Sequence, residues 1–302
     1  MNKGFLLAIL IFCVGLCSAQ ELTGVYQERF EAIALKLWTN PELGYQETLS
    51  SELLKGILED EGFSIIGNLA DIPTAFRAVY GESGPTIGIL GEFDALPGLS
   101  QTNSPFQEKA PNSNGAGHAC GHHLFGAGSA WAAVMIKQWL IETKTPGRII
   151  FFGTPAEEGG SGKVYMAREG AFENVDIMFH WHPSSSNQAN SSTSNANKSG
   201  KFTFKGISAH AASAPDKGRS ALDGVEAMNM MVNMMREHIP QESRIHYVIT
   251  KGGLAPNVVP DHAEVYYYVR HPDRLVVKQL FERVVKAAEG AAMGTETKLS
   301  YE

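Results

Sequence analysis

Apolar residues recur every three to four positions in the first half of the chain, which is typical of helices that bury one face. This spacing predicts helices over Glu21–Leu37, Thr48–Glu61 and, roughly, Leu124–Glu142. Short, almost wholly apolar runs between and after them predict strands over Ala75–Tyr80, Thr86–Gly91, Arg148–Phe152 and Val175–Trp181. Helices that alternate with such strands favour an α/β fold, in which helices cover both faces of a mixed sheet.

The apolar pattern stops at Pro183–Gly200, where serine, asparagine and threonine dominate. Such a composition is rich in turn formers and cannot form a core, so it predicts a loop or linker. We therefore expect a domain boundary in this segment. The expected limits are residues 20–195 for a catalytic domain and 196–302 for a second, smaller domain.

The second half of the chain has its own regular order of elements. We expect them in the order strand, helix, strand, strand, helix and strand, over Lys201–Lys205, Ala221–His238, Arg244–Thr250, Ala263–Arg270, Leu275–Ala288 and Thr297–Tyr301. This βαββαβ order is that of a ferredoxin-like domain. Ser220 stands where the N-cap of the first helix belongs, and Asp223 three residues later resembles the partner in a capping box.

Five methionines lie in that first helix, at positions 228, 230, 231, 234 and 235. Methionine is flexible and polarisable, so the cluster has two interpretations. It is either an adaptable binding surface or, as we expect, part of the core or of a contact between subunits.

The N-terminus has the three zones of a secretory signal peptide, with Lys3, an apolar run over Phe5–Leu16 and the small residue Ala19 before Gln20. A membrane anchor is the alternative, but the run is shorter than the roughly 20 residues that a spanning helix needs. We therefore expect residues 1–19 to be removed, no membrane span in the mature chain, and export to the periplasm or the medium.

Charge and cysteine content narrow the function. The net charge of −7 becomes −8 when Lys3 is removed with the signal peptide, since residues 1–19 contain no acid, and this acidity disfavours nucleic acid as a partner. Cys13 and Cys17 also lie in the signal, so the mature chain keeps Cys120 alone. A solitary thiol in an exported protein is exposed to oxidation, and ligation to a metal is a physical reason to retain it.

Cys120 and His122 are separated by one glycine before the long helix, which lets both side chains reach one point. A thiolate and a neutral imidazole together suit zinc or a similar ion. Glu157 and Glu158 follow the strand Arg148–Phe152. Metal hydrolases need one carboxylate as a ligand and another as the base that deprotonates bound water, and this pair supplies both.

Further candidates stand near the ends of two other predicted strands. His180 and His182 share one face of an extended segment, and from the residues alone either is a candidate ligand. His118 is expected to be a loop residue or to support a ligand. Asp94 either orients an imidazole or simply caps a turn.

These motifs together resemble the M20 family of metallopeptidases and amidohydrolases, and nearly the whole mature chain takes part in the match. The resemblance rests on Gly91-Glu-Phe-Asp-Ala-Leu-Pro97, Gly117-His-Ala-Cys-Gly-His122, Pro155-Ala-Glu-Glu-Gly-Gly-Ser-Gly-Lys163, Trp181-His-Pro183 and Lys205-Gly-Ile-Ser-Ala-His-Ala-Ala212. Within the family, the chain is most similar to the aminobenzoyl-glutamate utilisation branch. The resemblance implies a zinc-peptidase-like catalytic domain and a ferredoxin-like lid that also mediates dimerisation.

Residue by residue, the resemblance implies roles for eight positions. The metal ligands are Cys120, His122, Glu158 and His182, with Glu157 as the base, His210 as the residue that stabilises the oxyanion, and Asn257 and Arg270 as substrate-binding residues. Asp94 is our candidate for a residue behind a ligand, from its position after a predicted strand. The implied cofactors are divalent ions, Zn²⁺ or Mn²⁺, two per complete site. The implied assembly is a homodimer through the lid, or a pair with a related hetero-subunit.

The chain departs from the family pattern at three places. Glu92 stands where many relatives have histidine, and His123 stands where they have aspartate or asparagine. His123 is therefore either a substitute ligand or simply the start of a helix. The family chain also continues past the lid and supplies a final metal-binding histidine, so we expect this chain to be a C-terminally truncated form.

The expected function is hydrolysis of the amide bond of an N-acyl or N-aroyl amino acid such as p-aminobenzoyl-glutamate, with closure of the lid over the substrate. The alternative is a truncated homologue that binds metal and dimerises without turnover. Mixed thiolate and imidazole ligands favour zinc, whereas the carboxylates admit manganese.

Overall fold

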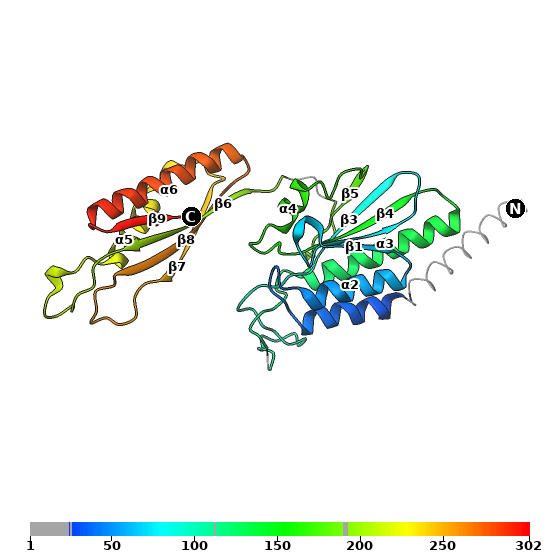
Figure 1. Ribbon diagram of the computed structural model, residues 1–302, viewed down its shortest axis with the longest axis horizontal. Coiled ribbons are helices and arrows are strands. Elements are labelled where there is room, and N and C mark those ends of the chain that lie inside the picture. The colour runs from blue at the N-terminus through cyan, green and yellow to red at the C-terminus, as the bar shows by residue number, and fades with distance from the viewer. Residues whose placement is uncertain (1–23, 25, 112, 190–192) are drawn as a thin grey trace, which may run out of the picture. The chain divides into compact units, whose positions relative to one another are not determined.

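The computed structural model describes residues 24, 26–111, 113–189 and 193–302, and the predicted signal peptide lies outside them. The chain divides between Asn187 and Gln188 into two compact units, here called unit 1 and unit 2 (Figure 1). Each has its own sheet and core. The assignment of 20–195 to catalysis and of 196–302 to a lid stays a prediction.

Unit 1 is built on a mixed sheet, as predicted, and this sheet has five strands. Its strands run in the order β1-β2-β4-β3-β5, with bounds Ser64–Gly67 for β1, Phe76–Tyr80 for β2, Thr86–Glu92 for β3, Arg148–Thr154 for β4 and Ile177–Phe179 for β5. β3, β4 and β5 are parallel, whereas β1 and β2 pair antiparallel. The C-terminal ends of the three parallel strands therefore meet at one rim, where Glu92 lies opposite Thr154.

Both faces of this sheet are covered. The side chains of its strands alternate between the two faces, so neighbouring residues pack on opposite sides. Phe151 of β4 joins a core with α2 (Thr48–Asp60), α3 (His122–Thr143) and a helix over 26–39. Its neighbour Phe152 packs on the other face against Phe172, beyond the short helix α4 (Gly162–Arg168). Among the described residues, α3 alone is long and apolar enough to cross a membrane, and half of that apolar window is buried within unit 1.

Three elements of unit 1 differ from the predictions. β1 and α4 were not predicted, because each is short and neither has a sustained apolar period. β5 is also shorter than the predicted strand Val175–Trp181, so His180 and His182 lie beyond its end. These two imidazoles are consequently placed by packing rather than by the alternation of a strand.

Unit 2 has the predicted ferredoxin-like order. Its elements are β6 (Ala196–Lys205), α5 (Ala221–Met235), β7 (Arg244–Lys251), β8 (His262–His271), α6 (Arg274–Gly294) and β9 (Lys298–Tyr301). The strands form an antiparallel sheet in the order β7-β8-β6-β9. Both helices contribute to the core that covers one face of this sheet. The predicted N-cap is confirmed, since the Ser220 hydroxyl accepts a hydrogen bond from the backbone N–H of Asp223 at 3.1 Å.

The predicted linker Pro183–Gly200 is too long, because β6 begins at Ala196. Residues Ala196–Gly200 pair along β8, with Asn197 opposite Arg270. The side chains of Asn197, Lys198 and Ser199 are exposed. The segment therefore has the polar composition of a loop, although its backbone pairs as a β-strand. The methionines of α5 divide in the same way, since Met228 and Met235 are buried whereas positions 230, 231 and 234 are exposed.

A buried hydrogen bond in unit 2 allows a stability test. The Tyr267 hydroxyl donates to Asn229 Oδ1 at 2.5 Å, and both side chains are buried. Tyr267→Phe leaves that acceptor unpaired, which we expect to reduce the free energy of unfolding by about 1–3 kcal/mol. Tyr266→Phe is the matched control, because the Tyr266 side chain is only partly buried, and it should change stability by less than about 0.5 kcal/mol. Equal losses in thermal unfolding would contradict the assignment.

Candidate metal centre

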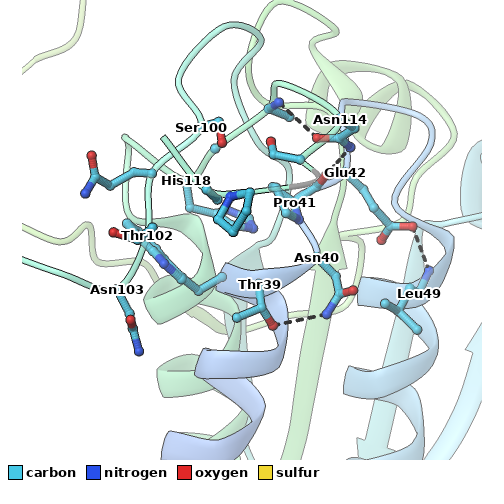
Figure 2. A pocket seen from close by; sticks show the side chains of 17 residues that line it. Thr39, Asn40, Pro41, Glu42, Leu49, Ser100, Thr102, Asn103, Asn114 and His118 are labelled. Carbon is cyan, nitrogen blue, oxygen red and sulfur yellow. Dashed lines mark hydrogen bonds between the residues drawn. The ribbon is translucent and has the colours of Figure 1, made fainter. Parts of the chain in front are cut away.

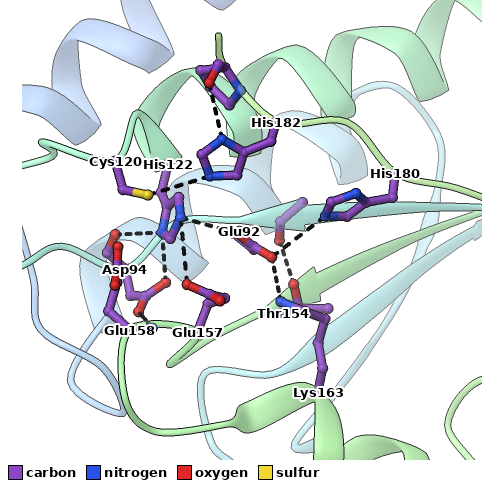
Figure 3. Close-up of polar contacts among 12 residues, drawn as sticks. Glu92, Asp94, Cys120, His122, Thr154, Glu157, Glu158, Lys163, His180 and His182 are labelled. Carbon is purple, nitrogen blue, oxygen red and sulfur yellow. Dashed lines mark hydrogen bonds and ion pairs between the residues drawn. The ribbon is translucent and has the colours of Figure 1, made fainter. Parts of the chain in front are cut away.

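The predicted ligands of unit 1 gather at the rim formed by the parallel strands (Figure 3). Glu92 ends β3, Glu157 and Glu158 follow β4, and His182 follows β5. Cys120 and His122 come from the turn that leads into α3. Open α/β sheets form their sites at this edge because loops that are distant in sequence meet there.

Three of the four predicted ligands form one group. The donor atoms of Cys120, His122 and His182 all lie within 4.8 Å of one another, and Cys120 Sγ is 3.4 Å from His182 Nε2. Gly121 makes this possible, because it has a φ of +78° and a Cβ there would lie 2.9 Å from the ring of Pro183. We call these three residues the thiolate group.

Asp94 contacts the imidazole of His122 from behind. His122 Nδ1 lies 3.0 Å from Asp94 Oδ1 and 3.1 Å from the Asp94 carbonyl. The other carboxylate oxygen of Asp94 accepts the backbone N–H of Glu158 at 2.8 Å. Asp94 therefore makes the contacts of both interpretations, one with an imidazole and one that caps a turn. Its contact with Nδ1 leaves Nε2 of His122 as the atom that faces the site.

Two buried atoms at the rim have no hydrogen-bond partner among the described residues. They are His122 Nε2 and Glu158 Oε1. Glu92 Oε2 lies 3.0 Å from His122 Nε2, within ion-pairing distance. Buried polar atoms are almost always satisfied in proteins. An orphaned nitrogen and an orphaned carboxylate oxygen beside a thiol fit the donor set of a divalent cation.

The free thiol of Cys120 is electrostatically matched to such a cation. Burial, together with the hydrogen bond and negative charge of Glu158, raises the pKa of Cys120 to about 12. The thiolate therefore forms when a cation offsets these carboxylates. Glu158 thus lies next to Cys120, although it belongs to neither of the two donor groups that the described residues form.

His122 is held between two carboxylates. Burial alone would lower its pKa, but the contacts with Asp94 and Glu92 raise the pKa of His122 to about 10. Burial would likewise raise the pKa of Glu92, and the contacts with His122 and Lys163 instead lower it to about 2. The rim is therefore rich in negative charge, which favours a bound cation.

Glu157 stands at the front of the site. Its Oε2 lies 4.0 Å from His122 Nε2, and its side chain is 43 % exposed. Burial, followed by the charge of Glu92, raises the pKa of Glu157. A carboxylate with a raised pKa, in reach of solvent and next to a ligand, has the properties of a general base.

Glu47 is a supporting residue that sequence reasoning missed. It is fully buried and accepts hydrogen bonds from the Ala156 N–H at 2.8 Å and from the Thr74 hydroxyl at 3.0 Å. Ala156 has a φ of +54° and directly precedes Glu157. Glu47 therefore anchors the turn that carries both glutamates. The only signal in the sequence was a glutamate at the start of a helix.

The other imidazoles lie around this group. His180 Nε2 is 3.9 Å from Glu92 Oε1 and belongs to neither donor group, so the geometry favours His182 as the ligand. Phe125 of α3 packs edge-on against the rings of His180 and His182, at 5.2 and 6.0 Å. Trp181 stands between these two histidines in the sequence, and its indole N–H donates to the Ser129 hydroxyl at 2.9 Å. These contacts with α3 hold the segment after β5.

His118 and His123 point elsewhere. His118 Nε2 lies 3.1 Å from the Leu37 carbonyl, and the ring of His123 lies 4.7 Å from that of Trp38. Burial lowers the pKa of both to about 4. His118 also lines a cavity of about 590 Å³ beside Trp38 and Glu42 (Figure 2), and none of the predicted metal ligands lines that cavity.

The predicted residues of unit 2 lie within that unit. His210 Nδ1 accepts hydrogen bonds from the backbone N–H groups of Ala212 and Ser213, both at 3.2 Å, which places the ring hydrogen on Nε2. The backbone carbonyl of Asn257 accepts the N–H of Ala211 at 3.0 Å. The guanidinium of Arg270 lies 5.2 Å from the ring of Tyr268. The roles expected for His210, Asn257 and Arg270 stay predictions.

Residues 194–296 match the model of the peptidase dimerisation domain of M20 proteins. The chain is 44 % identical to one of the subunits of p-aminobenzoyl-glutamate hydrolase from Escherichia coli K12, covering 90 % of this chain and 56 % of that protein. It is 32 % identical to the Xaa-Arg dipeptidase of Mus musculus, covering 89 % and 61 %. The chain thus spans less than two thirds of the length of these relatives.

Two solved structures share the fold. A dinuclear metal-binding peptidase of the M20 family from Bacillus subtilis superimposes with a TM-score of 0.64 and 23 % identity, covering 92 % of this chain and 74 % of that one. An aminobenzoyl-glutamate utilization protein from Klebsiella pneumoniae gives a TM-score of 0.63 and 19 % identity, covering 94 % and 76 %. At these identities the structural comparison shows the fold alone.

The anchoring role of Glu47 can be tested by stability. Glu47→Ala removes a buried acceptor of two hydrogen bonds, so we expect the free energy of unfolding to fall by about 1–3 kcal/mol or more. Glu52→Ala is the control, because Glu52 is exposed and pairs only with the nearby Lys55 in the described structure, and it should cost less than about 1 kcal/mol. Chemical unfolding measures both, and similar losses would argue against an anchor.

The two imidazoles after β5 provide a matched pair for metal binding. His182→Ala removes a member of the thiolate group, and we expect zinc affinity to fall by roughly tenfold or more. His180→Ala leaves that group intact and should change the affinity much less. Competition with a chromophoric chelator measures both constants, and a larger loss for His180→Ala would reverse the assignment.

Proposed function

Because this chain belongs to the M20 family of metallopeptidases and amidohydrolases, we propose that it hydrolyses the amide bond of N-acyl or N-aroyl amino acids at the rim of unit 1. The observation that carries the proposal is the convergence of Cys120, His122 and His182 beside Glu157. A binding protein would have no need of a half-exposed carboxylate with a raised pKa next to its metal ligands.

Cys120, His122, Glu158 and His182 would hold the metal ion. A divalent ion bound there polarises a carbonyl group and acidifies water. The thiol and the two imidazoles favour Zn²⁺, whereas Glu158 is compatible with Mn²⁺. Asp94 would fix the tautomer of His122 by contacting Nδ1, so that Nε2 faces the ion. We propose up to two ions for a complete site.

Glu157 would act as the base. It would accept the proton of the attacking water and then donate it to the leaving amine. The raised pKa of Glu157 suits both halves of this cycle, because the carboxylate must first take a proton and then release it. Its partial exposure leaves it in reach of water.

Unit 2 would complete the enzyme. We propose that His210 stabilises the oxyanion through its Nε2–H, which the two backbone donors to Nδ1 leave in the correct tautomer. Arg270 and Asn257 would bind the polar end of the substrate, since a guanidinium recognises a carboxylate in a bidentate manner. The match of residues 194–296 to a dimerisation domain supports assembly through this unit, as a homodimer or with a related subunit.

p-Aminobenzoyl-glutamate is the first substrate to test, because the name of the Escherichia coli relative identifies it as part of a hydrolase of that compound. The Mus musculus relative is named as a dipeptidase, so a dipeptide is the appropriate comparison substrate. We further propose that the protein acts outside the cytoplasm, on the basis of the apolar run Phe5–Leu16 and the small residue Ala19.

The role of Glu157 gives the decisive test. Glu157→Gln keeps the size of the side chain but cannot accept a proton, so we expect the release of p-aminobenzoate to fall by roughly 10²- to 10⁴-fold. Bound metal, measured by elemental analysis, should be unchanged. Glu169→Gln, on the helix-terminal residue after α4, is the control for loss of one negative charge.

Two other results would be informative. Metal binding without turnover of any N-acyl amino acid by the unaltered chain would overturn the hydrolase while retaining the metal centre. Full turnover by Glu157→Gln would instead assign the proton transfer to another group.

A further inference from the structure

An ion pair between a partly buried lysine and a buried glutamate lies at the metal site and has no part in the function proposed above. Lys163 Nζ is 2.5 Å from Glu92 Oε1, and the Glu92 side chain is only 3 % exposed (Figure 3). The other oxygen, Oε2, is 3.0 Å from His122 Nε2. Glu92 thus divides its two oxygens between an ammonium group and a ligand imidazole.

The turn after the glutamates brings Lys163 into this position. Ser161 has a φ of +58°, and a Cβ on Gly162 would lie 2.1 Å from the Pro155 carbonyl. The chain therefore folds back tightly on the end of β4 before α4 begins. A Cβ at Gly162 would clash with this carbonyl, so the tight turn that precedes Lys163 requires glycine.

His122 is shared by two possible donor groups. The first is the thiolate group, and the second consists of Glu92, His122 and Glu157, whose donor atoms also lie within 4.8 Å of one another. Nε2 is the nitrogen of His122 that faces both groups, because Nδ1 contacts Asp94. One imidazole nitrogen binds one metal ion, so the two groups compete for the same atom.

We propose that Lys163 decides this competition. Its ammonium group pairs with Glu92 Oε1 and so puts a positive charge on the same carboxylate whose Oε2 faces His122 Nε2. Two cations on one carboxylate in a buried site repel each other strongly. Lys163 is thus a positioning residue that excludes a metal ion from the Glu92 group and directs it to the thiolate group. This inference rests on the proposed metal centre.

Cobalt substitution provides a readout that does not depend on activity. Co²⁺ bound by a thiolate shows an intense charge-transfer absorption, whereas Co²⁺ bound by carboxylates and imidazole does not. We expect the purified chain to show this absorption and Cys120→Ala to remove it, with a loss of Co²⁺ affinity of at least roughly tenfold. Absence of the absorption in the unaltered chain would overturn the metal centre itself, which separates that failure from failure of the present inference.

The discriminating variant is Lys163→Met, which removes the ammonium group and frees Glu92. We expect its thiolate absorption at one equivalent of Co²⁺ to fall by at least half, because part of the metal moves to the Glu92 group. In the double variant with Cys120→Ala, Co²⁺ affinity should be at least roughly tenfold higher than in Cys120→Ala alone. Lys163→Arg keeps the positive charge and should behave like the unaltered chain.

Lys163→Gln makes the same comparison if Lys163→Met does not fold, because it keeps a hydrogen-bond donor to Glu92 while removing the charge. Circular dichroism and thermal unfolding verify that each variant is folded. The inference is wrong if the uncharged variants keep the full thiolate absorption and lose as much Co²⁺ affinity on Cys120→Ala as the chain that keeps Lys163.

Discussion

The parallel register of β3, β4 and β5 is the constraint on which the site depends. It puts the ends of three strands side by side, with Glu92 opposite Thr154. The segments that leave these ends carry Asp94, the glutamate pair and the two imidazoles. Parallel strands require long crossovers, so residues more than 60 positions apart in sequence become neighbours at one rim. Neither the thiolate group nor the proposed base exists without this sheet.

Negative charge gathered at this rim sets the second condition. Glu92 and Asp94 are buried, and Glu157 and Glu158 lie beside them. Burial of unpaired carboxylates is costly, so each must find a cation or a hydrogen-bond donor. Lys163, His122 and the backbone N–H of Glu158 meet part of this need. The unpaired Oε1 of Glu158 represents the remainder, which a divalent ion would satisfy.

Supporting residues fix the positions of the side chains at the site. Glu47 lies beneath the glutamate turn, Phe125 packs against the imidazoles after β5, and Gly121 allows the close approach of Pro183. None of them is a candidate ligand. Each of them fixes the direction of a residue that is a candidate ligand. This direction matters because a reactive group that is misplaced by about 1 Å loses much of its effect.

The sequence by itself determined the main helices and strands and the inventory of reactive groups. Apolar periodicity is a local property, so β4 and the ferredoxin-like order of unit 2 were predictable, as were the candidates Cys120, His122 and His182 from their motifs. Weak or short patterns carried too little signal, which is why β1, α4 and the first half of β6 were not predicted.

Only the tertiary structure decided which groups meet. It distinguished His182 from His180 as the neighbour of Cys120, placed His123 against Trp38, and brought Lys163 onto Glu92 and Glu47 beneath Ala156. Each of these contacts joins residues that are 62 to 109 positions apart. A contact between distant residues depends on the register of the sheet and on packing against α3, and neither is encoded in any single stretch of sequence.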